Sequence, residues 1–317
     1  MNSNLYALIG LGVATSFIMA LKGLSAPKTA RRGNLIGAFG ATVATVVVFF
    51  DPAIENGHNT LLIIGAIAFG VVVGVPAARK IQMTQMPQLV ALFNGVGGGA
   101  AALVAIVEYL NLGDSASFGE VLATVFTVLV GSVSFSGSII TFLKLQELMT
   151  TRPVVFPGGR FVIAATLVGA LGTSGWVIAS GGTTPLLVLA ALSLLFGVLF
   201  VLPVGGADVP IVISLLNAFT GLTVAASGYV LQSTLLIVAG TLVGASGTIL
   251  TRKMAEAMGR SLFGTLFGAF TAKPQAASEA GEARTVKSGS ADDVAILLNY
   301  AQRVVIVPGF GLAVAQA

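Results

Sequence analysis

GGADVPIVISLLNAFTG, residues 205–221, sets two polar side chains, Asp208 and Asn217, beside and within a long apolar run. Polar groups in such a run are costly unless they are paired or line a hydrated path, so both residues are functional candidates. They are about two and a half helical turns apart, which puts them on opposite faces of one helix. The spacing therefore predicts separate roles for Asp208 and Asn217.

The composition of the whole chain indicates that this run belongs to a membrane protein. Of the 317 residues, 56% are hydrophobic and 9% are charged, whereas a soluble domain carries roughly 25% charged residues. We therefore expect an all-α polytopic membrane protein. Cysteine is absent and the single histidine, His58, lies in a polar loop, so neither a disulfide framework nor a metal site is expected.

Nine segments meet the requirement for a membrane span, which is about 20 mostly apolar residues. The segments are 4–23, 33–50, 60–78, 87–108, 119–142, 161–180, 185–203, 208–231 and 234–252. The first segment has no positive charge before it and no good cleavage site after it. We therefore expect it to be a retained helix and not a signal peptide.

The charges between the segments predict an orientation. In this nine-span arrangement all 16 basic residues fall on one side of the membrane, and the connections on the other side hold no Lys or Arg. Because basic loops stay in the cytoplasm, the pattern predicts an outside N-terminus and a cytoplasmic C-terminus. The same alternation places Asp208 at the cytoplasmic end of its helix.

The composition changes after Arg252. We expect a transmembrane domain over 1–252, an exit helix and flexible linker over 253–290, and the beginning of a Rossmann-type α/β domain over 291–317. In the last part, Ser290 and Asp293 are spaced like a capping box at a helix start, and RVVIV at 303–307 predicts a strand.

The sequence Gly309-x-Gly311-x-Ala313 follows that predicted strand. Glycines in a strand–turn–helix context are typical of a dinucleotide-binding turn, where they allow the backbone to approach the pyrophosphate. One helix and one strand do not complete a doubly wound sheet, so we expect the chain to stop early in this domain.

Small and polar residues recur along one face of the segment 119–142. This stripe consists of Thr124, Thr127, Gly131, Ser134, Ser138 and Thr141, at helical spacings of three and four. It could be a close helix contact in which the hydroxyls bond to their own backbone. The alternative is that it lines a water-filled path.

Glycines raise a similar question in other segments. Asn94 is followed by GVGGGAA, which predicts a weak helix, close packing, or both. The GxxxG patterns at Gly240 and Gly244, and at Gly70 and Gly74, predict close helix packing. An amide such as Asn217 also needs partners in hydrocarbon, which either an inter-helix hydrogen bond or a water in a proton path would supply.

The chain resembles the β subunit of the proton-translocating nicotinamide nucleotide transhydrogenase. The motifs that carry the resemblance are KIQMTQMPQLVALFNGVGG (80–98), SVSFSGSIITFLKL (132–145), GGADVPIVISLLNAFTG (205–221), GTLVGASGTIL (240–250) and VVIVPGFGLAVAQA (304–317). The resemblance implies nine β-subunit helices followed by an NADP(H)-binding Rossmann domain. It also implies hydride transfer from NADH to NADP⁺, coupled to inward proton movement.

The resemblance assigns roles to particular residues and none of them is catalytic. Ser138 and Asn217 match positions that line the proton path, and Asp208 matches an acidic residue that senses the NADP(H) domain. The other matches are Gly244, Ser246 and Gly247 in the helix that leads to the linker, and Gly309, Phe310, Gly311 and Ala313 at the start of the NADP(H) site.

Asn94 stands where several members of the family carry a proton-transferring histidine. An amide does not bind and release protons at physiological pH, so either waters near Asn94 and Asn217 conduct alone or a partner chain supplies the titratable group. We expect the partner to supply it, because no acid or base of this chain lies in the middle of a span.

The resemblance also implies the partners and the location of the chain. These are an α subunit with the NAD(H) domain and further membrane helices, a lipid bilayer, and paired protomers in a bacterial or archaeal plasma membrane; nucleic acid is not expected. The alternative is a transporter or channel for a small solute with a nucleotide-sensing tail, which predicts inverted repeats. A purely structural subunit would leave Asp208 and Asn217 replaceable.

Overall fold

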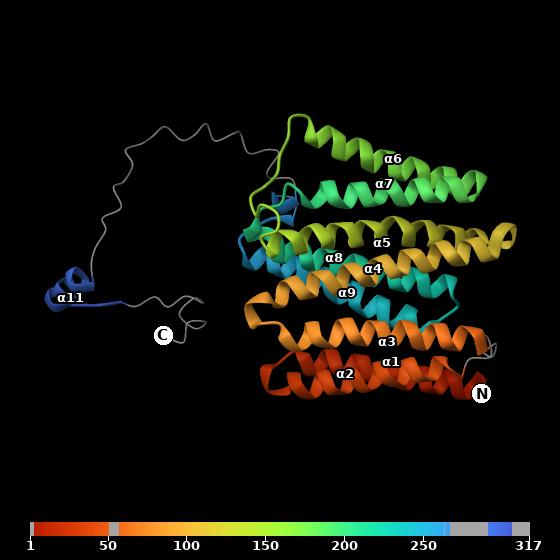
Figure 1. Cartoon of the computed structure of the whole chain (residues 1–317), viewed down its shortest axis with the longest axis horizontal. Coiled ribbons are helices and arrows are strands. Elements are labelled where there is room, and N and C mark those ends of the chain that lie inside the picture. Colours follow the sequence, from red (N-terminus) through yellow and green to blue (C-terminus); the bar gives the residue numbers. More distant parts are fainter. Residues whose placement is uncertain (1–2, 51–56, 263, 267–290, 306–317) are drawn as a thin grey trace. The chain divides into compact units, whose positions relative to one another are not determined.

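The computed structural model describes residues 3–50, 57–262, 264–266 and 291–305. Over these residues the secondary structure is helical and includes no strand (Figure 1). The contacts divide the chain into two units, Met1–Thr271 and Ala272–Ala317. The first unit is a bundle of long helices, and it carries most of the described residues.

Each predicted span coincides with a helix in the described part of the chain. The helices of the first unit are α1 (Ser3–Leu24), α2 (Pro27–Val48), α3 (Gly57–Lys80), α4 (Met86–Leu112), α5 (Phe118–Leu145), α6 (Gly159–Ser180), α7 (Thr183–Val201), α8 (Val209–Val230) and α9 (Thr234–Ala257). By length and composition, seven of them, α3 to α9, can cross a membrane. The crossing of α1 and α2 stays a prediction, since basic residues occupy the first turns of α2 and the apolar part of α1 is short.

Local sequence signals set several helix ends. Proline lies in the first turn of α2, α4 and α8, where its missing N–H removes no helical hydrogen bond. At the start of α5, the Glu120 backbone donates to Ser117 Oγ at 3.3 Å, and the Ser117 backbone donates to Glu120 Oε2 at 2.8 Å. This reciprocal capping box satisfies two backbone donors that the helix itself leaves free.

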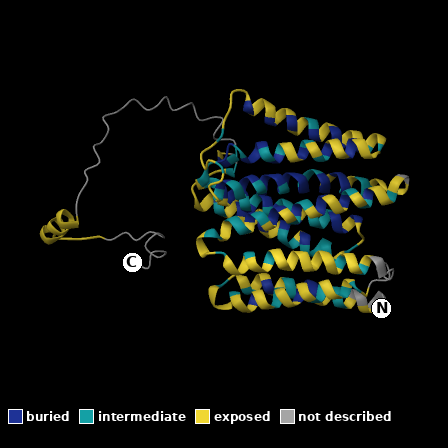
Figure 2. Ribbon diagram, viewed as in Figure 1, coloured by how far each residue is buried: buried dark blue, intermediate teal, exposed yellow. Residues whose placement is uncertain are grey.

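Helix α5 is the centre of the bundle. It packs against α4, α7 and α8, and α8 packs in turn along α9. Figure 2 shows α5 buried along most of its length, whereas α3 is exposed along its whole length. Two apolar clusters flank α5: one around Val128, Val177 and Leu189, and one around Val201, Val212 and Leu216.

Glycine allows the closest helix pairs to approach backbone to backbone. A Cβ at Gly221 of α8 would collide with the backbone of Gly244 in α9, and a Cβ at Gly240 would collide with Ala225. A Cβ at Gly131 of α5 would lie 2.7 Å from the carbonyl oxygen of Gly98 in α4. The predicted packing role of Gly240 and Gly244 is therefore confirmed, and α4 is a continuous helix in which the glycines serve close packing.

The prediction of close packing at Gly70 and Gly74 is wrong within the described chain. No heavy atom of the described residues lies within 4 Å of a Cβ built at either glycine. The physical reason is that α3 makes few contacts with the other helices, so small residues on its surface face no neighbouring backbone.

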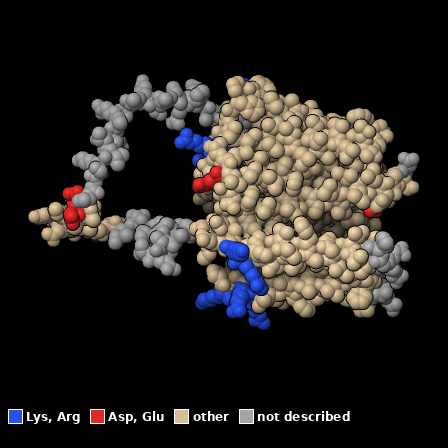
Figure 3. Space-filling view, in the orientation of Figure 1, with Lys and Arg blue, Asp and Glu red and all other residues tan. Residues whose placement is uncertain are grey.

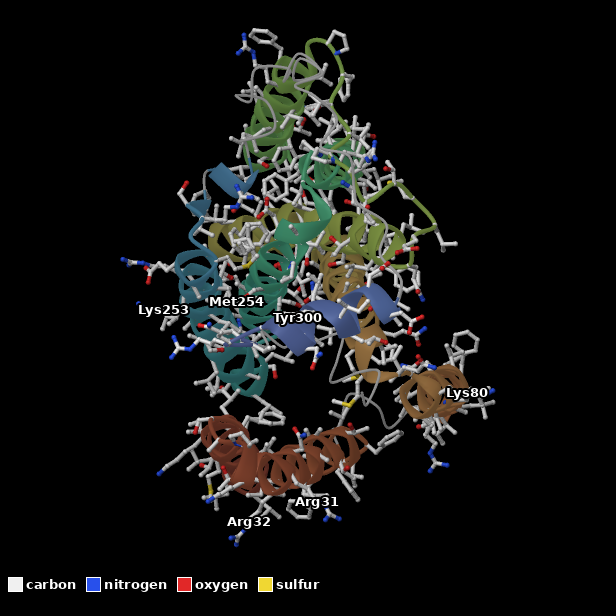
Figure 4. All side chains as sticks on the ribbon, turned by 90° about the vertical axis from the view of Figure 1, so that its left-hand side faces the viewer. Arg31, Arg32, Lys80, Lys253, Met254 and Tyr300 are labelled. Atoms are coloured by element: carbon white, nitrogen blue, oxygen red, sulfur yellow. The ribbon has the colours of Figure 1, made fainter. Side chains whose placement is uncertain are left out.

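Lys and Arg gather at one end of the bundle, the left-hand end in Figure 3. Figure 4 looks onto this end and shows Arg31 and Arg32 of α2, Lys80 of α3 and Lys253 of α9 pointing outward. The fold thus collects at one end basic residues that lie far apart in the sequence. This is the arrangement that the loop charges predict, and the orientation across a membrane stays a prediction.

Helix α9 continues to Ala257, beyond the predicted end of the span at Arg252. In the second unit, α11 (Ala291–Tyr300) occupies the position of the predicted helix. The predicted strand at 303–307 is absent over its described part, Arg303–Val305, where no neighbouring strand is available to pair with it. Residues 306–317 lie outside the described part, and with them Gly309, Phe310, Gly311 and Ala313.

Candidate functional site

The candidate site lies where α4, α5 and α8 meet, and glycine brings the first two helices together. A Cβ at Gly95 would lie 2.9 Å from the Cβ of Ser138, and one at Gly98 would lie 3.1 Å from the Cβ of Ser134. The absence of side chains at these two positions lets α4 lie directly on the serines of α5. The neighbouring Asn94 therefore reaches them across the helix interface.

Four side chains form a hydrogen-bonded group at this junction, which we call the polar cluster: Asn94, Ser134, Ser138 and Thr220. Asn94 Nδ2 donates to Ser138 Oγ at 3.0 Å and to Ser134 Oγ at 3.3 Å. Ser134 Oγ lies 2.6 Å from Thr220 Oγ1 of α8. The polar cluster therefore connects three helices, with Ser134 fully buried, Ser138 1% exposed and Thr220 half-buried.

Two of the three hydroxyls of the polar cluster, those of Ser134 and Thr220, share one backbone acceptor. Ser134 Oγ lies 3.0 Å from the carbonyl oxygen of Leu216, and Thr220 Oγ1 lies 3.1 Å from the same oxygen. Each hydroxyl has one proton, so either Ser134 donates to Leu216 while Thr220 donates to Ser134, or the two roles are exchanged. Both arrangements contain the same number of hydrogen bonds, which lets the pair reverse its direction as a proton relay does.

The amide oxygen of Asn94 is an unused acceptor. Asn94 Oδ1 is buried and has no hydrogen-bond partner among the described residues. A buried polar atom without a partner costs roughly 1–3 kcal/mol, so this oxygen favours a water molecule or a donor group beside it. No ionisable side chain of the described residues bonds to the polar cluster, so within this part of the chain the cluster can orient a proton carrier without itself being charged.

Asn217 lies on α8 about one helical turn from Thr220. Its side chain is half-buried, and it makes no hydrogen bond to a described residue. The structure therefore brings Asn94 and Ser138 together and leaves Asn217 beside the polar cluster but not bonded to it. Ser134 and Thr220 complete the cluster. From the sequence, Ser134 was identified only as a member of the stripe in 119–142, and Thr220 was not singled out.

The part of the α5 stripe nearer Phe118 has two further hydroxyls without partners among the described residues. Thr124 and Thr127 are fully buried, and neither Oγ1 finds a hydrogen-bond partner among the described residues. Toward the other end of α5, Thr141 Oγ1 donates to the carbonyl of Gly137 at 2.8 Å in its own helix. The stripe is thus a close helix contact, with a glycine contact at Gly131 and inter-helix hydrogen bonds at Ser134 and Ser138. A water-filled path along it stays a prediction.

Asp208 has a charged partner that sequence reasoning missed. It ends the short 3₁₀ turn Gly206–Asp208 before α8, and its Oδ1 lies 3.4 Å from Arg260 Nε. The pair is close enough for ionic attraction, but Asp208 Oδ1 has no well-directed hydrogen bond. The side chains of Asp208 and Arg260 are 17% and 57% exposed, so the pair lies at the surface of the bundle.

The end of α9 places Arg260 for this contact. Gly259 has φ +64°, its N–H donates to the carbonyl of Glu256, and the Arg260 N–H donates to the carbonyl of Ala255. This is the Schellman pattern, in which a glycine with positive φ reverses the chain after a helix. The signal in the sequence is Gly259 directly before Arg260, six residues after the basic pair Arg252 and Lys253.

The predicted coupling residues of α9 divide between two faces of the helix. Gly244 and Gly247 are buried against α8, where Cβ atoms would lie 2.9 Å from Leu222 and 3.0 Å from Ala218. Ser246 is exposed on the other side, and its Oγ donates to the carbonyl of Val243 at 3.2 Å. The two glycines therefore set the distance between α8 and α9, and Ser246 takes no part in that contact.

Comparison with known proteins agrees with the motifs. Residues 6–317 match the family described as NAD(P) transhydrogenase beta subunit. The chain is similar to NAD(P) transhydrogenase subunit beta of Rhodospirillum rubrum, with 40% identity over 310 residues, which is 95% of this chain. A second Rhodospirillum rubrum sequence of the same subunit has the same identity and coverage. The match covers 66% of the length of these relatives.

Proposed function

Because the chain belongs to the family of NAD(P) transhydrogenase beta subunits, we propose that it is the membrane subunit that couples inward proton movement to hydride transfer from NADH to NADP⁺. In this proposal the transmembrane domain over 1–252 conducts the proton. The exit helix and linker over 253–290 connect it to an NADP(H)-binding domain that begins at 291.

The polar cluster is the observation that carries this proposal. Its hydrogen bonds link α4, α5 and α8 in the interior of helices that can span a membrane. Buried polar groups at membrane depth are costly and mark ion or proton pathways. We assign the proton path to Asn94, Ser138 and Asn217 and add Ser134 and Thr220, whose hydroxyl pair can pass a proton in either direction.

The titratable group of the path would come from the α subunit. The unpartnered Asn94 Oδ1 is the acceptor that would hold this group or a water bound to it. An acid or imidazole from a partner helix would supply the protonation change that an amide does not undergo. The membrane potential then acts on the transferred charge, and 100 mV contributes ~2.3 kcal/mol per charge, which is roughly a 50-fold bias toward NADPH.

Helix α8 would carry the signal between the two functions. It begins directly after Asp208, which faces Arg260, and it holds Thr220 and Asn217 farther along. Gly244 and Gly247 let α9 pack on it at close range. We propose that Asp208 and Arg260 respond to the NADP(H) domain, and that α8 and α9, with Ser246 on the free face of α9, pass this response into the membrane.

The cofactor assignments rest on the sequence. Gly309, Phe310, Gly311 and Ala313 would form the tight turn at the pyrophosphate of NADP(H), and the nicotinamide ring of that cofactor would accept the hydride. NAD(H) would bind to the α subunit. The assembled enzyme would contain paired protomers in a bacterial or archaeal plasma membrane.

The test is hydride transfer by the complete enzyme, with both subunits and the whole NADP(H) domain, in sealed liposomes containing a pH-sensitive dye. Transfer from NADPH to NAD⁺ should move protons toward the outer face of the protein, and an ionophore should abolish the pH change. Hydride transfer without any proton movement would contradict the proposal.

A variant locates the path. Asn217→Leu should reduce proton-coupled transfer by at least ~10-fold, the effect of about 1.4 kcal/mol on the barrier. It should leave hydride exchange between NADH and an oxidised NAD analogue through bound NADP(H) nearly unchanged, because that exchange needs no proton crossing. Equal loss of both activities would show that Asn217 is structural.

A further inference from the structure

Lys144, in the last turn of α5, is a fully buried lysine. It has 0% exposure, and it is the largest of the fully buried side chains in the described part of the chain. Its Nζ donates to the carbonyl oxygens of Leu202 at 2.6 Å, Val204 at 2.7 Å and Val201 at 3.3 Å. The three donors of the ammonium group therefore meet three acceptors on a single turn of chain.

The partners of Lys144 are unusual for a buried charge. Among the described residues it forms no ion pair with a carboxylate, and its acceptors are backbone carbonyls at the end of α7. The carboxyl end of a helix carries partial negative charge, which favours a cation there. Burying an ammonium is nevertheless expensive, and an apolar side chain of similar length would fill the same space. We therefore infer that Lys144 fixes the position of the three carbonyl groups relative to α5, in addition to filling space.

The turn that Lys144 holds leads directly to Asp208. After Val204 come Gly205 and the 3₁₀ turn Gly206–Asp208. The connection between α5 and α6 supports the same turn, since Val154 N donates to the Leu202 carbonyl at 3.0 Å and Gly206 N donates to the Thr151 carbonyl at 2.8 Å. Hydrogen bonds from Lys144 of α5 and from the connection that follows α5 therefore fix the turn before Asp208.

The same helix reaches the polar cluster. Ser134 and Ser138 project from α5 toward α4 and α8, and Lys144 lies about 9 Å farther along the helix axis than Ser138 at ~1.5 Å per residue. Helix α5 is continuous over this distance. A displacement of α5 at the polar cluster would therefore be transmitted to the Lys144 ammonium and, through three hydrogen bonds, to the turn before Asp208.

We propose that Lys144 is a positioning residue that couples the polar cluster to the Asp208–Arg260 pair by holding the turn Val201–Val204 to α5. The inference rests on the proposed proton-coupled function and adds a second connection to the one through α8. A change at the polar cluster would then reach Asp208 along two helices, through α8 directly and through α5 by way of Lys144.

The experiment compares Lys144→Met with wild type in the complete enzyme in liposomes. Methionine is likewise unbranched and only one heavy atom shorter, and it removes the charge and the donors. The ratio of proton-coupled transfer to proton-independent exchange should fall by at least ~10-fold, the factor that loss of one charge-assisted hydrogen bond produces. The matched control is Ser136→Ala, a buried α5 residue whose Oγ donates to the Ser132 carbonyl of its own helix at 3.0 Å, and it should keep the wild-type ratio.

A double variant separates positioning of Asp208 from a general loss of structure. If Lys144 acts through Asp208, Lys144→Met combined with Asp208→Asn should lower the ratio no more than the stronger single variant does, since coupled residues are not additive. A multiplicative loss would overturn the proposal. Should Lys144→Met fail to assemble, Lys144→Gln carries the same comparison, because it removes the charge and is too short to keep all three hydrogen bonds; a wild-type ratio in it would also overturn the proposal.

The outcomes also distinguish this inference from the function on which it rests. A wild-type enzyme that moves no protons during hydride transfer would refute the proposed function. A wild-type enzyme that couples the two, beside an assembled Lys144→Met enzyme with an unchanged ratio, would refute the role of Lys144 alone.

Discussion

Removal of a single hydroxyl, by Ser134→Ala, tests whether the polar cluster conducts. Ser134 Oγ takes part in three contacts of the cluster, with Asn94 Nδ2 at 3.3 Å, the Leu216 carbonyl at 3.0 Å and Thr220 Oγ1 at 2.6 Å. Alanine removes the atom that joins Asn94 to α8 and adds no bulk. The variant therefore interrupts the connection between the helices without disturbing the glycine contacts around it.

The structure predicts a small effect of this variant on stability. Asn94 keeps its hydrogen bond to Ser138 at 3.0 Å, and Thr220 keeps its bond to Leu216 at 3.1 Å, so no other partner loses its last hydrogen bond. An inter-helix hydrogen bond in a membrane contributes ~0.6 kcal/mol on average and at most about 1.7 kcal/mol. Ser134→Ala loses two such bonds net, because Thr220 still donates to Leu216. The free energy of unfolding should therefore fall by ~1.2 kcal/mol, and the enzyme should assemble.

The expected effect on proton movement is larger. Without Ser134 Oγ the relay has no hydroxyl between Asn94 and Thr220, so proton-coupled transfer should fall at least ~10-fold, which corresponds to about 1.4 kcal/mol. Proton-independent exchange and the Ser136→Ala control should stay within about twofold of wild type. The assay is proton uptake into liposomes beside thermal unfolding of the same preparation. A Ser134→Ala enzyme with the wild-type coupling ratio would refute the assignment of the path to the polar cluster.

Two other substitutions test the rest of the arrangement. Asp208→Asn should leave the melting temperature nearly unchanged, because a surface ion pair contributes at most ~1 kcal/mol. The variant should change the rate of NADP(H) release or the proton coupling. Wild-type values for both would show that Asp208 takes no part in coupling. Gly221→Ala should destabilise the bundle by roughly 1–3 kcal/mol through overlap with the Gly244 backbone, measured by thermal unfolding in detergent. Gly70→Ala, at an open position of α3, is its control and should not destabilise, and equal losses in the two variants would contradict the packing described for α8 and α9.

The sequence by itself determined which segments form helices and which family the chain belongs to. Hydropathy is a property of about 20 consecutive residues, and the position of a basic residue between apolar runs is likewise local. For this reason the helices fall where the apolar runs predict them, and the basic residues gather at one end of the bundle. The exception is the strand predicted at 303–307, which is absent over its described part, Arg303–Val305, because a strand needs a partner that lies elsewhere in a chain.

The tertiary structure decided which polar residues meet. The sequence predicted a proton path through Asn94, Ser138 and Asn217. Only Asn94 and Ser138 are hydrogen-bonded to each other, because that contact depends on how closely α4 approaches α5. Arg260 and Lys144 counted in the sequence only as loop charges. The fold places one beside Asp208 and buries the other beneath a turn that lies 57 to 60 residues farther along the chain.

The two GxxxG patterns give the plainest case of this difference. Gly240 and Gly244 in α9 pack against the backbone of α8, whereas Gly70 and Gly74 in α3 face no described neighbour. The local pattern is the same in both helices, and it states only that a close approach is sterically allowed. Whether the approach occurs depends on a second surface of matching shape, and that surface is set by helices distant in the sequence.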